Sequence, residues 1–101
     1  MNDKLKPHPR LDEFLKVIGE LNSNALTANG LEAAIVGYIE RMGSEPLIVF
    51  SRERTLKILM QNDGLNYEDA LEHFEFNILG AWIGPGTPVF MTTIDEGLVT
   101  F

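Results

Sequence analysis

The chain has 101 residues, of which 45% are hydrophobic and 23% are charged, and it contains no cysteine. This length and composition predict a single folded domain over residues 1–101, and they exclude disulfides, thiolate zinc sites and cysteine nucleophiles. The formal net charge of −7 is unevenly spread, because residues 61–101 contain seven acidic side chains and no Lys or Arg. Such a field repels nucleic-acid backbones and anionic membranes and attracts basic surfaces, although acidic charge can also serve solubility alone.

The N-terminal residues are polar and interrupted by two prolines, so residues 1–9 are expected to form a flexible arm. No apolar run has the length of a secretory signal or a membrane span, which predicts a cytoplasmic protein. From Leu11 to Leu21, apolar residues recur at spacings of three and four. This spacing predicts a helix with one apolar face.

Residues 31–42 fit two interpretations. Their apolar positions match a helical stripe, but residues 35–39 are mostly β-branched or aromatic and include a glycine, which favours a strand. A turn at Gly43–Pro46 follows, and the run Leu47–Phe50 after it is typical of a buried strand. We therefore favour an antiparallel hairpin that pairs residues 33–41 with residues 47–51.

Two helices are predicted next, over residues 52–62 and 67–79. Ser51 and Asn66 are suited to the N-cap position of each, and Gly64 is suited to a left-handed cap at the end of the first helix. The sole tryptophan, Trp82, is expected in the core.

Beyond this helical hairpin, the turn Gly84–Pro88 leads into a predicted strand, Val89–Thr92, and a short terminal strand is expected over Leu98–Phe101. The polar residue Asn77 lies in an apolar run and is expected to be a buried amide that bonds loop backbone. The predicted fold class is α+β: a small antiparallel sheet, made of the β-hairpin and one or two C-terminal strands, packed with an N-terminal helix and an α-hairpin.

The predicted helix 67–79 carries three glutamates on one face. At 100° per residue, Glu72 and Glu75 fall about 40° and −20° from Glu68, and we call these three residues the acidic stripe. Phe76 falls at about 80°, away from the predicted core face. Phe76 is therefore either packed by a second element of the same chain or exposed as a contact site among acids. The candidate partner-binding residues are Glu68, Glu72, Glu75 and Phe76.

Other familiar site types lack support in the sequence. A helix-turn-helix would use helix 67–79 to read DNA, but that helix has no basic residue. Asp69 and His73 could chelate one ion, yet a zinc site needs three or four ligands and His8 lies in the arm. No nucleophile–base spacing, phosphate loop or dinucleotide fingerprint occurs, so no catalytic, cofactor-binding or metal residue is predicted.

Part of the chain resembles a family of short uncharacterised proteins of bacteriophages and prophages. The resemblance covers about residues 31–92 and is carried mainly by EDALEHFEFNILGAWIGPGTPVF, residues 68–90, together with residues 34–41. The family has no assigned activity, so it implies no catalytic residues. It implies a phage-encoded accessory protein that acts inside a bacterial host cell, and it favours the strand interpretation of residues 33–41.

These observations predict a non-enzymatic, host-modulating interaction protein that uses its acidic C-terminal half to bind a protein with a basic surface. One alternative is mimicry of nucleic acid, which would inhibit a host DNA- or RNA-binding protein. Another is a small enzyme that uses Glu72, His73 and Glu75, and it predicts a concave pocket at that helix. An exposed Phe76 is also compatible with a homo-oligomer in which a second copy buries it.

Overall fold

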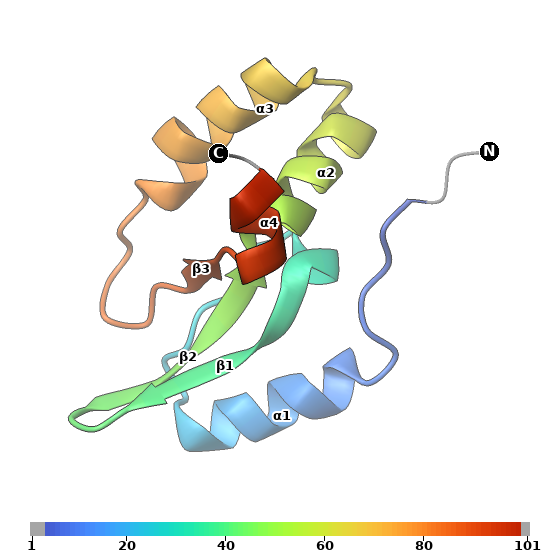
Figure 1. Cartoon of the computed structure of the whole chain (residues 1–101). Coiled ribbons are helices and arrows are strands. Elements are labelled where there is room, and N and C mark those ends of the chain that lie inside the picture. Colours follow the sequence, from blue (N-terminus) through green and yellow to red (C-terminus); the bar gives the residue numbers. More distant parts are fainter. Residues whose placement is uncertain (1–3, 100–101) are drawn as a thin grey trace.

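The computed structural model describes residues 4–99, which adopt the α+β fold that the sequence predicts, with a small three-stranded sheet. Figure 1 shows α1 alongside one end of the β1–β2 hairpin and the helices α2 and α3 beyond the other end. The elements in chain order are α1 (Leu11–Leu21), the 3-10 turn η1 (Glu32–Ala34), β1 (Ile35–Arg41), β2 (Ser44–Ser51), α2 (Arg52–Asp63), α3 (Tyr67–His73), the π-helical segment η2 (Phe74–Leu79), β3 (Val89–Met91) and α4 (Ile94–Val99).

The hairpin of β1 and β2 confirms the strand interpretation of residues 31–42, with two adjustments. Residues 32–34 form the turn η1, so the strand begins at Ile35. The hairpin turn is also tighter than the expected Gly43–Pro46, because Arg41 already pairs with Ser44. Gly43 makes this turn with a φ of 86°, a conformation that glycine adopts without steric cost.

The third strand pairs in the opposite sense to the prediction. β3 lies beside β2 and runs parallel to it, with Phe50 opposite Phe90, so the sheet is mixed and its order is β1-β2-β3. The reason is the connection between the strands: α2, α3 and η2 carry the chain across before β3 begins, and parallel strands require such a crossover.

The caps of the helical hairpin confirm the sequence prediction. The Ser51 hydroxyl accepts a hydrogen bond from the Arg54 amide at 3.1 Å, and the Asn66 side chain accepts one from the Asp69 amide at 2.8 Å. Gly64 ends α2 in the left-handed region, with a φ of 70°. These three residues fix where α2 and α3 begin and where the chain turns between them.

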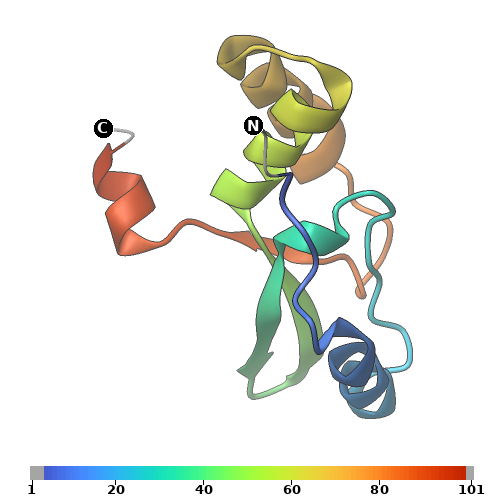
Figure 2. The same ribbon diagram turned by 90° about the vertical axis from the view of Figure 1, so that its right-hand side faces the viewer.

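The expected terminal strand, Leu98–Phe101, was wrong. Residues 98 and 99 belong to the helix α4, and residues 100–101 lie outside the described residues. A reciprocal capping box starts this helix: the Thr93 hydroxyl accepts from the Glu96 amide at 3.3 Å, and the Glu96 carboxylate accepts from the Thr93 amide at 3.4 Å. Figure 2 shows α4 standing away from the rest of the molecule.

Phe90 on β3 joins two clusters of buried side chains into one core. One cluster lies between α1, the hairpin and α2, and the other lies between α2 and the helix of α3 and η2. The Phe90 ring centroid is 5.5 Å from that of Phe50 and 5.1 Å from that of Phe74, which it meets edge to face. Phe50 and Phe74 are both fully buried.

The N-terminal arm contacts the body of the domain. The Leu5 amide donates to the side-chain oxygen of Gln61 at 3.1 Å, and the Arg54 guanidinium donates to the Lys6 carbonyl at 3.5 Å. Leu5 also packs against the first core cluster. Residues 5 and 6 are therefore tied to α2 by both polar and apolar contacts.

The buried amide expected at Asn77 is instead Asn22, which follows α1. Asn22 is 3% exposed; its amide donates to the Pro46 carbonyl and its oxygen accepts from the Asn24 amide, both at 2.9 Å. Asn77 is exposed, with its amide nitrogen 3.1 Å from the His73 Nδ1 atom.

We expect Asn22→Ala to lower the free energy of unfolding by about 2 kcal/mol, because it removes a buried side chain and its two part-buried hydrogen bonds, to the Pro46 carbonyl and from the Asn24 amide. Asn77→Ala is the matched control, and as a surface change it should alter the stability by less than about 0.5 kcal/mol. Urea unfolding followed by circular dichroism measures both values. Equal effects of the two substitutions would contradict the assignment of the structural amide to Asn22.

Candidate functional site

The acidic stripe lies on the solvent side of an amphipathic helix. Glu68 and Glu72 belong to α3 and are exposed, whereas Ala70 and Phe74 on the opposite side are fully buried against α2. This alternation follows from the helical period, since residues two positions apart point to different sides. α3 thus holds the first two carboxylates of the stripe in fixed positions on its outer face.

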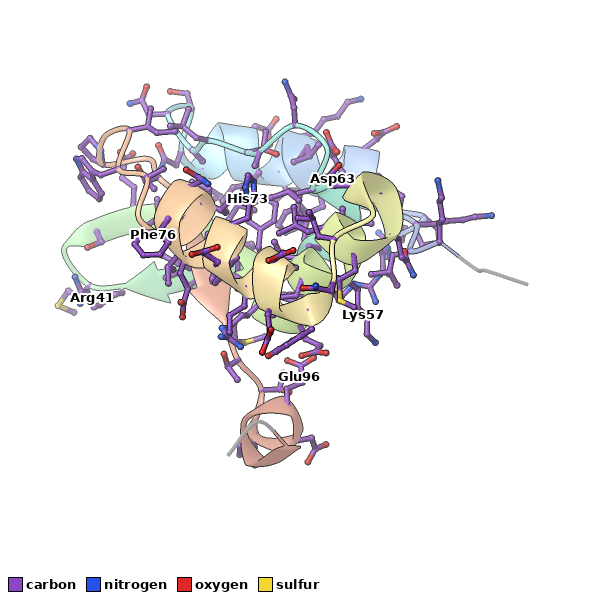
Figure 3. The ribbon with its side chains drawn as sticks, turned by 90° about the horizontal axis from the view of Figure 1, so that it is seen from above. Arg41, Lys57, Asp63, His73, Phe76 and Glu96 are labelled. Carbon is purple, nitrogen blue, oxygen red and sulfur yellow. The ribbon has the colours of Figure 1, made fainter. Side chains whose placement is uncertain are left out.

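Phe76 is exposed, which decides between the two interpretations of the sequence. It lies on η2, where 76% of its surface is accessible, and Glu75 beside it is exposed as well. Figure 3 labels Phe76 on the side from which the β1–β2 turn also projects. The four predicted partner-binding residues are therefore all exposed, Glu68 and Glu72 on α3 and Glu75 and Phe76 on η2.

No basic side chain of the described residues forms an ion pair with a glutamate of the acidic stripe. The neighbouring helix α2 carries three cations, and two of them contact groups other than the glutamates of the stripe. The Arg52 guanidinium lies 5.7 Å from the centroid of the Phe74 ring, and the Arg54 guanidinium donates to the Ala33 carbonyl at 2.8 Å. The third cation, Lys57, is exposed. The charge of the acidic stripe thus remains available to solvent and to a partner.

Trp82 does not occupy the core position that the sequence analysis predicted. It is 75% exposed, and its neighbour Ile83 is 70% exposed. Two hydrogen bonds hold this loop in an ordered turn: Thr87 accepts from the Ile83 amide at 2.9 Å and donates to the Gly84 carbonyl at 2.7 Å. The fold therefore presents Trp82 and Ile83 to solvent from a braced turn.

Four large apolar side chains between residues 76 and 83 are exposed. Leu79 at the end of η2 is 52% exposed, and in the sequence it lies between Phe76 and the pair Trp82 and Ile83. We call these four residues the apolar ridge. Sequence analysis identified only Phe76 as a candidate for exposure. The other three residues adjoin Gly80 and the turn-forming residues 84–88, and this neighbourhood was the sequence signal that they lie on the surface.

A groove of about 830 Å³ runs beside the apolar ridge. One wall comes from residues 79–82 and 85–90, and the other comes from the hairpin turn around Ser44 and from the loop after α1. Of the apolar ridge, Leu79 and Trp82 line this groove. Of the described residues that line it, Glu45 is the only charged one. A second groove, of about 710 Å³, lies between the N-terminal arm, α1 and β1 and includes Lys6, Arg10 and Arg54. This second groove therefore carries three cations, whereas the groove beside the apolar ridge has none among its described lining residues.

The residues of the enzyme hypothesis do not converge on an enclosed site. Glu72, His73 and Glu75 are all exposed. His73 lines a groove of about 480 Å³ next to Asn77, but neither glutamate lines that groove. Among residues 4–99, no group of three or more His, Asp or Glu side chains is arranged to hold a metal ion.

Within the described part of the chain, no helix is both long enough and apolar enough to cross a membrane. Comparison with known protein families, curated proteins and solved structures finds no match to this chain. The resemblance to phage proteins therefore stays a prediction, and the geometry of the acidic stripe and the apolar ridge supplies the functional evidence.

Proposed function

We propose that this chain is a non-enzymatic interaction protein, which binds a protein partner with a basic surface through the acidic stripe and Phe76. The observation that carries the proposal is that the three carboxylates are exposed and form no ion pair with a described residue. The largely exposed aromatic ring of Phe76 directly follows Glu75 in the chain. Unpaired carboxylates steer a basic partner and set its orientation, and an aromatic anchor supplies affinity once water is excluded.

The resemblance to bacteriophage and prophage proteins supports a setting for this interaction. In that setting the chain is an accessory or host-modulating factor in the cytoplasm of a bacterial cell, and its partner is a host protein. Mimicry of nucleic acid is a special case of the same interaction. It would be favoured if the captured proteins bind nucleic acid and are displaced by added DNA or RNA.

Affinity capture from a bacterial lysate, followed by mass spectrometry, tests the proposal. We expect basic proteins to be retained by the wild type and to be reduced about tenfold or more on the variant Glu68→Gln/Glu72→Gln/Glu75→Gln, which has the same side-chain shapes without the charge. Raising the salt concentration should weaken the wild-type capture, because mobile ions screen exposed charges.

A matched control is the variant Asp12→Asn/Glu20→Gln/Glu40→Gln, which removes three exposed carboxylates from α1 and β1. It should retain the same proteins as the wild type. Both variants should unfold within about 0.5 kcal/mol of the wild type, as expected for surface substitutions. Equal recovery of the same proteins by the acidic-stripe variant and the wild type would refute the proposal.

A further inference from the structure

The apolar ridge exposes more aromatic and aliphatic surface than a small domain normally leaves in water. Phe76, Leu79, Trp82 and Ile83 lie within eight residues of one another, and each has more than half of its surface accessible. Contiguous exposed apolar patches of this kind typically mark binding sites. Large side chains that are held outward by a hydrogen-bonded turn also lose little conformational freedom when a partner covers them.

The chemistry around the apolar ridge restricts what can cover it. Glu75 and Leu79 both belong to the π-helical segment η2, and both are exposed. Across the groove, Glu45 occupies the opposite wall. The groove thus has a largely apolar lining that includes Leu79 and Trp82, and among its described lining residues Glu45 is the only charged one and none is basic.

This distribution of charge disfavours a second copy of the chain as the occupant. A symmetric dimer brings the same patch of each copy together, so the acidic stripe of one copy would approach that of the other. Like charges that face each other across an interface cost free energy. A partner segment with an apolar stripe flanked by Lys or Arg complements both the apolar lining of the groove and the carboxylates near it.

We infer that the groove and the apolar ridge form the docking site for a basic amphipathic helix of the partner protein. This inference rests on the proposed function and specifies the partner's binding element. An amphipathic helix places apolar anchors at positions i, i+3, i+4 and i+7, and it can carry Lys on both borders of that stripe. The anchors contact Leu79 and Trp82 in the groove and Ile83 next to Trp82 in the chain, while the lysines approach Glu45 and the acidic stripe.

Trp82 is the only tryptophan of the chain, so its fluorescence reports directly on occupancy of this site. The probe is a synthetic peptide of about 18 residues, five helical turns, built from Leu and Lys with the Leu residues on one face. It contains no aromatic residue. We expect a blue shift of the Trp82 emission on titration, with a Kd of about 1–100 µM.

Two further peptides separate charge from shape. A peptide with Glu in place of Lys keeps the apolar face and should bind at least about tenfold more weakly, a difference of about 1.4 kcal/mol. A peptide of the same Leu and Lys composition without an apolar face should also bind about tenfold more weakly. Equal binding of the three peptides would overturn the inference, and so would the absence of any emission shift with the amphipathic basic peptide.

Protein variants then locate the site. Leu79→Ser/Ile83→Ser should weaken binding of the basic peptide about tenfold, whereas Val17→Ser/Val36→Ser, at half-exposed positions beside the other groove, should not. Circular dichroism checks that both variants fold. Unchanged binding by the Leu79/Ile83 variant would overturn the docking site. A Trp82 emission that is already blue-shifted in a dimer, as detected by light scattering, would assign the surface to a second copy instead.

The peptide titration and the lysate capture fail independently of each other. If the Leu79/Ile83 variant binds the peptide normally while capture still depends on the acidic stripe, the proposed function stands and the docking site is wrong. If capture does not depend on the acidic stripe, the proposed function is wrong whatever the peptides do.

Discussion

Phe74→Ala is expected to lower the free energy of unfolding by about 4 kcal/mol, the usual cost of truncating a fully buried phenylalanine. The ring has no exposed surface, meets Phe90 edge to face at 5.1 Å and lies under the Arg52 guanidinium. A domain of this size has a total stability of about 5–15 kcal/mol, so the variant should be partly unfolded or close to unfolding at 37 °C. Thermal and urea unfolding by circular dichroism measure the loss.

Phe76→Ala is the matched control, because it removes the same side chain two positions further along the helix. Its ring is 76% exposed, so the change in stability should stay within about 0.5 kcal/mol. The two variants also separate fold from function, since only Phe76→Ala should reduce partner capture in a folded protein. A large loss of stability in Phe76→Ala would show that this ring is buried and would remove it from the binding surface.

Gly86→Ala should destabilise the domain by about 3 kcal/mol, at the upper end of the cost of overpacking. A Cβ atom at this position would lie 1.9 Å from the Asn24 carbonyl oxygen and 2.9 Å from its carbon, both of which are backbone atoms. The Gly86 carbonyl also accepts a hydrogen bond from the Leu26 amide at 3.0 Å. Relief of the clash therefore requires the two loops to separate, which breaks this bond.

Gly19→Ala provides the comparison for the same chemical change. Gly19 lies in α1, and a Cβ atom there would meet nothing within 4 Å. Alanine is preferred to glycine inside a helix by about 1 kcal/mol, so this variant should be as stable as the wild type or more stable. Similar stabilities of Gly86→Ala and wild type would mean that the loops around Gly86 and Asn24 are not packed as closely as described.

Local signals in the sequence were sufficient for the helical hairpin and for the first two strands. Capping interactions form within three or four residues of the chain, so they can be predicted from local sequence. Ser51 and Asn66 cap the N-termini of α2 and α3, and Gly64 ends α2 in the left-handed conformation, as the sequence predicts. The same kind of signal was present at Thr93 and Glu96, whose spacing is that of a capping box. Here the β-branched residues nearby suggested a strand, and the capping residues were the better guide.

The direction of β3 and the location of the buried amide depend on tertiary structure, so no local pattern fixes them. Asn22 and Asn77 are both amides with apolar neighbours, but only Asn22 meets a backbone carbonyl of the hairpin, at Pro46. β3 runs parallel to β2 because of where the crossover returns the chain. Neither fact is visible in residue types or spacing.

The exposure of Glu68 and Glu72 was predictable because they repeat with the helical period over α3, and Glu75 follows them on η2. The apolar ridge was only partly predictable, for two reasons. η2 is a π-helical segment, so the angle of about 100° per residue that holds in α3 does not extend to Leu79. Trp82 then lies in a loop with no periodicity at all, and its exposure depends on the hydrogen bonds of Thr87.

The position of Phe90 has a consequence for how the chain is made in the cell. The hairpin and the helical hairpin leave the ribosome first, but the aromatic ring that joins their two clusters comes near the end of the sequence. Until it arrives, Phe50 and Phe74 lack their common neighbour. The contacts of Phe90 with both clusters therefore form only after β3 has been synthesised, and nascent chains without β3 should be held by chaperones or degraded.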